Sequence, residues 1–485
     1  MFGGVVSMER FVGIWTNDYD DKQITCELVV DNNKVEFFAR NFHHERKTVF
    51  KSENINGSYF TVITNRIAHD YHNKTMEDSF AYNVCYVVVC KNKLEDVSNI
   101  QISKLKFSFD ELDDWLNCNT IKINNDENGR DYISSENYDN IILQSEPKIE
   151  IKSIPFIYNE SRGSRYITSV VMSNEPHISI SYDNPVDVYE TFNDIVILIQ
   201  FFSMLIGKIS SVSDITIELT NDYLCYLFFN HDFSYNVRAV EVYHKNRINC
   251  ADIVSAIKSN FAQWKTFYTN NKYDILRLTY FDLNKNRQYI AEDTFIAYVR
   301  ILEGYHIRES DDEETINKIN GAQELLAKAV SDIIQNDHEK SIIKTVFSQI
   351  IPDYEINNKH LSEISKWIAR GYISKKSLET RIKELDNCYF EIVKKNSDNI
   401  KRTIENPPEI FDLYHWIGAT RNYYAHYKND KKDVMGYVSM CNTINILKAL
   451  ATMIILDKMG ISKDTIKQMM INDFELVFQT SCLKE

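Results

Sequence analysis

The residues of this 485-residue chain whose types and spacing could do chemistry lie near its end, where Arg421, Asn422 and His426 follow one another closely. Arginine offers a planar fork of donors to phosphate oxygens, and histidine can move a proton near neutral pH. Together they supply the charge and the proton transfer that phosphodiester cleavage needs without a metal ion. The structural alternative is an arginine and a histidine on the exposed edge of a core helix.

The spacing of these residues limits how they could meet on a helix. Five residues at about 100° each turn roughly 140°, so Arg421 and His426 do not share a face of an ideal helix. Asn422 and His426 are four residues apart and do share one, so the amide could orient the imidazole. Arg421 must then reach the same reaction centre from the side, or two copies of the helix must share the centre.

The spacing alone is not specific, because other arginines precede a histidine by a similar distance. Three further pairs fit the same loose pattern: Arg66 and His72, Arg238 and His244, Arg300 and His306. The pair near the end differs in its context. An asparagine directly follows the arginine, aromatic residues lie between, and a loop that carries Lys428 comes next.

The segment around the pair predicts one helix with a marked start. Asn406 is a suitable N-cap, Pro407 fits the first helical position, and Glu409 can reach back to the cap amide. Gly418 would permit close approach of another helix, from this chain or from a second subunit. Six residues at helical spacing predict one buried stripe: Leu413, Trp416, Ile417, Thr420, Tyr424 and Tyr427.

The rest of the chain divides into a strand-rich part and a helical part. From about residue 250 the apolar period is helical. Helices are predicted over 251–269, 290–309, 313–336, 340–350, 361–370, 376–396, 407–427, 434–459 and 463–479. Earlier, short β-branched and aromatic runs predict strands. They cover 24–30, 34–38, 59–64, 84–90, 104–109, 148–154, 166–171, 177–182, 214–219, 224–229 and 237–243.

Two helices are expected to interrupt the strands. Asp110 would cap a short one that ends at Trp115, and Asn184-Pro185 would open a longer one that ends at Gly207. We therefore predict an α+β fold with two domains. A β-rich domain over 1–245, with a recognition or regulatory role, precedes an all-helical domain over 250–485.

Composition narrows the class of protein. The chain is 44% hydrophobic and has only 13 Gly and 7 Pro, which is typical of a compact globular protein. Its net charge of −14 counts against a broad nucleic-acid-binding surface, although a nuclease cleft need only be locally basic. The sequence shows no phosphate-cradling glycine loop and no serine nucleophile elbow. The apolar run 195–206 is too short to span a membrane, and no signal peptide is evident, so we expect a cytoplasmic protein without membrane contact.

The cysteines and histidines do not form a recognisable metal site. The nine cysteines include no C-x-x-C pair, so we expect reduced thiols, as in a cytosolic protein. None of the best zinc candidates shows the paired spacing of a structural site. These candidates are His43-His44, His69 with His72, and Cys85 with Cys90. We therefore expect neither a metal nor a cofactor.

The residues around Arg421 resemble a known family. The long predicted helix ends in Arg421-Asn422, three further residues and then His426-Tyr427. This ending resembles the signature of the HEPN superfamily in its Apea-like branch. The segment 295–306, which contains Glu303, resembles the first HEPN helix of that branch. Gly13-Ile14-Trp15 and the segment 107–115 resemble the companion N-terminal domain of such proteins.

The resemblance implies an anti-phage, abortive-infection factor with a metal-independent ribonuclease domain. It implies a homodimer or higher even oligomer in which Arg421 and His426 of both copies face one cleft. The ribose 2′-OH would attack the adjacent phosphorus, leaving a 2′,3′-cyclic phosphate and a 5′-OH. The substrate would be RNA, with transfer RNA as a family-level candidate, and the trigger would come from the phage. Four residues would support the site or bind substrate: Asn422, Tyr427, Glu303 and Lys428.

Two other functions fit the sequence. The HEPN pair could be structural or could grip a nucleotide in a non-catalytic binding or phage-sensing protein, which the acidic balance and the large β-rich half favour. A metal-dependent hydrolase is the third alternative, and it would lose activity to a chelator. The RNA target, the trigger and the oligomer number do not follow from the sequence.

Overall fold

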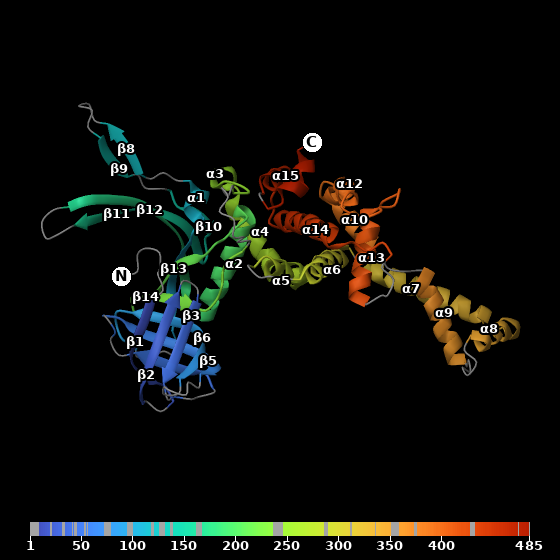
Figure 1. Cartoon of the computed structure of the whole chain (residues 1–485), viewed down its shortest axis with the longest axis horizontal. Coiled ribbons are helices and arrows are strands. Elements are labelled where there is room, and N and C mark those ends of the chain that lie inside the picture. Colours follow the sequence, from blue (N-terminus) through green and yellow to red (C-terminus); the bar gives the residue numbers. More distant parts are fainter. Residues whose placement is uncertain are drawn as a thin grey trace. The chain divides into compact units, whose positions relative to one another are not determined.

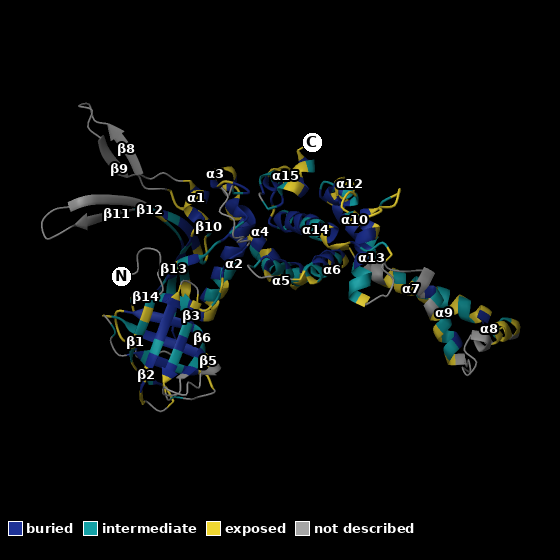
Figure 2. Ribbon diagram, in the orientation of Figure 1, coloured by how far each residue is buried: buried dark blue, intermediate teal, exposed yellow. Residues whose placement is uncertain are grey.

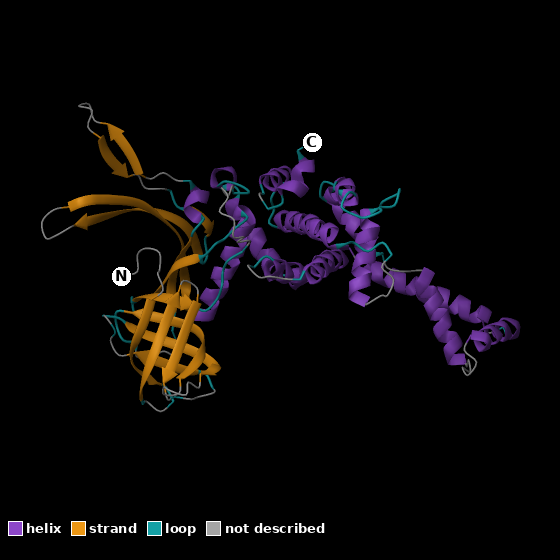
Figure 3. Cartoon of the chain, in the orientation of Figure 1, coloured by secondary structure: helices purple, strands orange, loops and turns teal. Residues whose placement is uncertain are grey.

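Strands come first and helices follow in this computed structural model of the chain (Figures 1 and 3). The structure describes residues 9–19, 22–31, 34–40, 42, 46–52, 55, 57–71, 79–94, 100–117, 121–125, 131–135, 139–161, 167–235, 246–285, 290–310, 313–334, 336–350, 358–372, 376–426, 432–473 and 475–484. The predicted α+β class, with a β-rich N-terminal part and a helical C-terminal part, is confirmed.

The chain forms two compact units. The first comprises residues 1–269, 281–288 and 455–477, and the second comprises 270–280, 289–454 and 478–485. The change from strands to helices falls between β14 (Leu224–Phe229) and α3 (Cys250–Ile253). The domain boundary near 245–250 stays a prediction.

Six strands of the first unit close into a barrel. Along the sheet β6 pairs with β3, then β2, β1, β4 and β5 follow, and β5 pairs back with β6. These strands are β1 (Glu9–Asn17), β2 (Gln23–Asp31), β3 (Lys34–Arg40), β4 (Thr48–Ser52), β5 (Tyr59–Tyr71) and β6 (Ser79–Cys90). Burial alternates along them (Figure 2), so one face of each strand fills the interior. The interior is aromatic, with the rings of Trp15 and Phe37 5.2 Å apart.

The sheet continues from β6 beyond the barrel. Strand β14 pairs with the end of β6, and β13, β7, β12, β11 and β10 follow in that order. Their bounds are β7 (Ile102–Phe109), β10 (Ile141–Gln144), β11 (Lys148–Ser161), β12 (Ile167–Val186) and β13 (Val212–Leu219). A separate ribbon consists of β8 (Ile121–Asn125) and β9 (Asp131–Ser135). The predicted strands 166–171 and 177–182 are one strand, β12, and the predicted strand 237–243 lies outside the described residues.

The expectation that all cysteines are reduced thiols is wrong at one pair. Cys90 on β6 and Cys225 on β14 form a disulfide. They are 135 residues apart in sequence but lie directly opposite each other in adjacent antiparallel strands. This pairing depends on strand register, which the cysteine spacing in the sequence does not reveal. It also removes Cys90 from the zinc candidates.

Helix α2 (Val188–Ile206) begins later than predicted. The side chain of Asp187 accepts a hydrogen bond from the Glu190 backbone amide and caps the helix, whereas Pro185 still belongs to β12. The predicted end is confirmed, since Gly207 has φ +99°. The short helix α1 (Leu112–Leu116) follows Glu111 rather than Asp110. Trp115 donates its indole N–H to the Ile248 carbonyl at 2.9 Å and packs edge-on against Phe202 of α2.

Replacing Asp187 with alanine is expected to lower the free energy of unfolding by about 1 kcal/mol, because it removes the only side-chain acceptor that the described residues give to the first turn of α2. Asp187→Asn keeps an acceptor and should cost less. Urea unfolding of both variants measures the difference. Equal losses in the two variants would contradict the capping role.

The remaining helices follow the predicted ones in order, with two additions. The sequence did not indicate α5 (Asp274–Leu283) or the short helix α12 (Ser397–Lys401). The others are α4 (Ile257–Thr269), α6 (Ala291–Ser310), α7 (Glu313–Ile334), α8 (Asp337–Ile350), α9 (Asn358–Tyr372), α10 (Leu378–Cys388), α11 (Ile392–Lys395), α13 (Leu413–His426), α14 (Tyr437–Lys458), α15 (Lys463–Asn472) and α16 (Val477–Thr480). By length and composition alone α2 and α14 could each cross a membrane, but most of each helix is buried inside the protein, as in a core helix.

Candidate active site

Helix α13 carries the arginine and histidine, and it starts seven residues after the predicted cap. Asn406 has φ +53°, and residues 403–412 lie outside any helix or strand. The predicted start is wrong because Pro408 follows Pro407, and a residue before proline is driven away from helical backbone angles. The helix begins instead at Leu413, where the Asp412 carboxylate accepts from the Tyr414 amide at 3.0 Å.

The predicted stripe of α13 is confirmed for its first part. Leu413, Trp416, Ile417 and Thr420 are buried, whereas Tyr424 is half-buried. Thr420 accepts a hydrogen bond from the Met435 amide at 3.0 Å, which fixes the chain where it returns after the motif. Two of the predicted support residues, Tyr427 and Lys428, lie outside the described residues.

The structure brings four of the predicted site residues together around the Arg421 guanidinium. One terminal nitrogen, Nη1, donates to the Asn422 side-chain oxygen at 3.0 Å and to Nε2 of His426 at 3.2 Å. The other, Nη2, lies 3.4 Å from the Glu303 carboxylate. Because arginine can only donate, Nε2 of His426 accepts and carries no proton in this arrangement.

The contacts correct one expectation about the site geometry. Asn422 holds the guanidinium of Arg421, and the structure shows no contact between its amide and the His426 ring among the described contacts. The arginine side chain is long enough to cross from its own face to the imidazole. Arg421 therefore reaches His426 from the side within one chain, which is one of the two possibilities that the helix geometry leaves.

Glu303 is the one member of this group that comes from another helix. It lies on α6, which packs against α13, and its side chain is about a quarter exposed, as is that of Arg421. His426 is exposed at the end of α13. The group therefore presents a fixed cation and an unprotonated imidazole nitrogen to solvent, which is an arrangement that can bind a phosphate and accept a proton.

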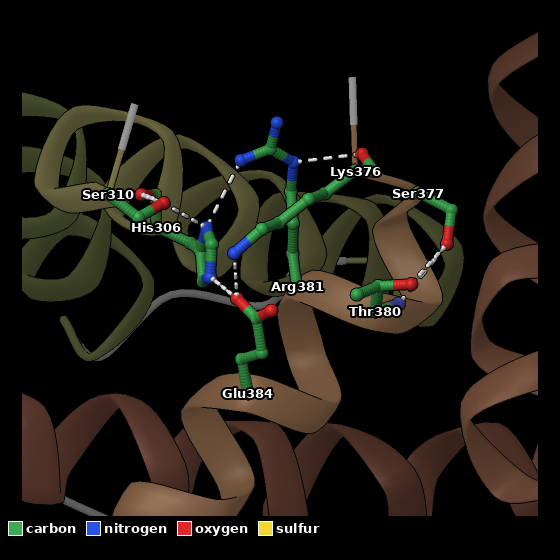
Figure 4. Close-up of polar contacts among 7 residues, drawn as sticks. All are labelled: His306, Ser310, Lys376, Ser377, Thr380, Arg381 and Glu384. Carbon is green, nitrogen blue, oxygen red and sulfur yellow. Dashed lines mark hydrogen bonds and ion pairs between the residues drawn. The ribbon is translucent and has the colours of Figure 1, made fainter. Parts of the chain in front are cut away.

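The pair Arg300 and His306, which fits the same spacing in the sequence, is arranged differently. Arg300 is exposed, whereas His306 is buried and its arginine contact comes from Arg381 on α10 (Figure 4). Nδ1 of His306 lies 3.1 Å from Arg381 Nη1 and 2.8 Å from the Ser310 hydroxyl. Nε2 lies 2.6 Å from the Glu384 carboxylate.

This second group ties α6 to α10, and burial of His306 and Arg381 closes its imidazole to substrate, whereas Glu384 and Lys376 are partly exposed. Lys376 also donates to Glu384 at 2.8 Å, and this hydrogen bond lowers the pKa of that carboxyl group, with a smaller contribution from His306. Sequence reasoning missed the group, because its members are separated by some 70 residues and no local motif joins them. The pairs Arg66–His72 and Arg238–His244 lie outside the residues whose side chains are described.

Another histidine of α13, His415, is not a member of the group around Arg421. His415 is half-exposed, with Nε2 3.2 Å from Asp433 and Nδ1 3.2 Å from Glu379. The hydrogen bond to Asp433, followed by that to Glu379, raises its pKa. Among the described residues no three His, Cys, Asp or Glu side chains converge as metal ligands, and His43, His44 and His72 are not described.

Comparison with known families agrees with both parts of the chain. The model of the Apea-like HEPN family matches residues 296–465, which include Glu303, Arg421 and His426. The model of ApeA N-terminal domain 1 matches residues 10–264, more than half of the chain. No curated protein and no solved structure gives a significant match. The chain therefore belongs to the family of ApeA-type HEPN proteins.

Proposed function

We propose that this member of an anti-phage HEPN family is a metal-independent endoribonuclease, with transfer RNA as the first candidate substrate. The observation that carries the proposal is the 3.2 Å contact between Arg421 Nη1 and His426 Nε2 at the solvent-exposed end of α13. The HEPN match adds support, since this domain family is generally associated with nucleases.

The chemistry assigns a separate task to each side chain. The ribose 2′-oxygen bonds to the adjacent phosphorus while the bond from phosphorus to the 5′-oxygen breaks, which leaves a 2′,3′-cyclic phosphate and a 5′-OH. Arg421 stabilises the charge that develops on the phosphoryl oxygens. His426 takes the proton of the attacking hydroxyl or returns one to the leaving 5′-oxygen.

The contacts of Arg421 leave part of its fork for RNA. In the free chain Asn422, His426 and Glu303 engage three of its five N–H donors, and Nε has no hydrogen-bond partner among the described residues, so a phosphate can use a remaining donor or replace one of these acceptors. Both terminal nitrogens donate to acceptors of this group, and the Glu303 carboxylate is the acceptor that carries negative charge. We assign Glu303 and Asn422 to positioning the guanidinium before substrate arrives.

Glu303→Gln is expected to lower the cleavage rate by about tenfold, because the guanidinium loses its charged anchor while keeping a hydrogen-bond acceptor. The free energy of unfolding should fall by less than about 1 kcal/mol, since the pair is partly exposed. Single-turnover cleavage and urea unfolding measure the two effects. A variant that cleaves at the wild-type rate would remove Glu303 from the site.

A second copy of the chain is part of the proposal. A homodimer, or a higher even oligomer, would bring two exposed ends of α13 to one cleft and place two Arg421 guanidinium groups there. RNA would then meet two arginines in one cleft, each paired with Glu303 in the free chain, on a protein whose net charge is −14. Sedimentation measures the oligomeric state.

One observation favours the non-catalytic alternative. Arg421 already donates to three acceptors within its own chain, as expected for a structural arginine in a nucleotide-binding or sensor protein. In that case Arg421→Ala would lower stability without changing any RNA-cleaving activity.

The deciding experiment is cleavage of total RNA and purified transfer RNA in excess chelator, in buffer and in phage-infected extract. Cleavage that leaves 2′,3′-cyclic phosphate ends supports the proposal. Activity that disappears with the chelator would overturn metal independence and favour a metal-dependent hydrolase. No cleavage in either buffer or infected extract would favour the binding protein.

A further inference from the structure

A cavity of about 590 Å³ opens at one end of the barrel. The start of β1, the connection between β4 and β5, the end of β6 and the turn before β14 enclose it, and all belong to the first unit. Its volume is within the range of small-molecule sites, which often occupy the mouths of β-barrels. Its apolar lining includes Phe11, Ile55, Phe60, Val89, Leu224 and Tyr226.

The inward face of β1 connects this cavity to a buried donor. Strand alternation places Glu9, Phe11, Gly13 and Trp15 on one face, and the first two line the cavity. Trp15 is fully buried, and its indole N–H has no hydrogen-bond partner among the described residues. A buried N–H without an acceptor costs about 1–3 kcal/mol, so it is a feature that needs an explanation.

Gly13 explains how the donor comes close to the cavity wall. A Cβ atom on Gly13 would lie 2.8 Å from Cδ1 of Ile55 and 3.9 Å from the indole nitrogen of Trp15. The absent side chain therefore leaves a position that is close both to Ile55, a wall residue of the cavity, and to the indole nitrogen of Trp15, which does not itself line the cavity. A ligand that displaces the end of the flexible Ile55 side chain could give the N–H its acceptor.

The lining defines what kind of molecule fits. The rings of Phe11 and Phe60 lie 4.5 Å apart, and Tyr223 and Tyr226 add two further aromatic side chains. Planar aromatic groups pack well against such rings. Glu9 and Asp222 are acidic and Lys91 is basic, so the lining has a net formal charge of −1. This balance disfavours a phosphate or another anion.

We propose that the barrel cavity is a binding site for an uncharged aromatic heterocycle of nucleoside size, whose acceptor atom pairs with the indole N–H of Trp15. The assignment is independent of the ribonuclease proposal, because none of its residues belongs to the helical site. Gly13 and Trp15 thereby have a binding role in addition to core packing.

The test is calorimetric titration of the full chain with adenosine, guanosine, cytidine and uridine, and with AMP as the charged counterpart. Reductant is omitted, because Cys90 lines the cavity and its disulfide fixes β14 beside it. We expect at least one nucleoside to bind with a Kd below about 1 mM, and AMP to bind about tenfold more weakly or not at all.

Two variants and a control connect binding to the cavity. Trp15→Phe removes the donor and keeps an aromatic ring, so it should weaken binding about tenfold, the value of one hydrogen bond. Tyr226→Leu should weaken it by a similar factor through lost stacking, whereas Tyr19→Leu, in the exposed turn at the other end of β1, should not. Thermal unfolding checks that each variant is folded. No binding by any nucleoside, or binding unchanged in both cavity variants, would overturn the proposal.

Discussion

Replacing His426 with alanine is expected to lower the rate of RNA cleavage by about 10²- to 10⁴-fold, the range lost with a general acid or base. The imidazole is exposed at the end of α13, so its removal costs little packing. Its Nε2 has a lone pair directed at Arg421, the group that would hold the phosphate. Single-turnover cleavage of a defined RNA measures the loss.

A matched control exists on the same helix. His415 precedes His426 by eleven residues, which turn about 20° beyond three full turns, so both project from one side of α13 about 16 Å apart. His415→Ala loses two partly exposed ion pairs, which should lower the free energy of unfolding by less than about 1 kcal/mol. The variant should cleave RNA at nearly the wild-type rate. A folded His426→Ala protein that still cleaves robustly would disprove the catalytic assignment.

The site was predictable to the extent that it is local. Arg421, Asn422 and His426 lie within two turns of one helix, so helical spacing placed them near one another before any tertiary contact was known. Glu303 entered only through the family resemblance, because the contact depends on how α6 packs against α13. The true partner of Asn422 also escaped prediction, since the path of a flexible arginine side chain is set by its acceptors and not by helix geometry.

Helix starts failed where two local signals conflicted. Asn406, Pro407 and Glu409 form a good capping pattern, but Pro408 makes Pro407 an unfavourable helical residue. At α2 the sequence favours a start at Asn184-Pro185, but β12 extends through Pro185 and Asp187 provides the cap. Each error moved a boundary and left the helix itself in place.

Barrel closure and the disulfide could not be predicted from local patterns. Strand alternation indicates a buried face, but it does not say that β5 returns to β6 or that Cys225 lies opposite Cys90. These pairings join residues far apart in sequence. The buried ion pair between Arg247 and Asp473 is of the same kind, because it joins the end of the β-rich part to a helix near the C-terminus.

Replacing Arg247 with methionine is expected to lower the free energy of unfolding by about 3–5 kcal/mol, the cost of leaving a buried charge without its partner. Arg247 is 1% exposed and Asp473 is 3% exposed. Beyond the ion pair, Nη1 of Arg247 donates to the Ser203 and Met204 carbonyls at 3.4 and 3.2 Å. These two carbonyls near the C-terminal end of α2 therefore have a cationic donor, which the helix dipole favours.

An exposed pair nearby provides the control. Lys463 and Asp457 lie 3.3 Å apart with both side chains more than a third exposed. Lys463→Met should therefore change stability by less than about 1 kcal/mol. Urea unfolding compares the two variants, and a loss below 1 kcal/mol for Arg247→Met would show that the buried pair is not structural.

The same ion pair determines how the regulatory hypothesis can be tested. A β-rich part that restrains the nuclease until a phage signal arrives predicts that residues 250–485 alone are more toxic than the full chain. That fragment lacks Arg247 and most of the first unit, however, and among the contacts of the described residues it would leave the Asp473 carboxylate with the amides of Glu475 and Leu476. A fragment with Asp473→Asn keeps an acceptor for these amides and removes the unpaired charge. Its toxicity therefore reports on restraint, and a folded fragment no more toxic than the full chain would end that hypothesis.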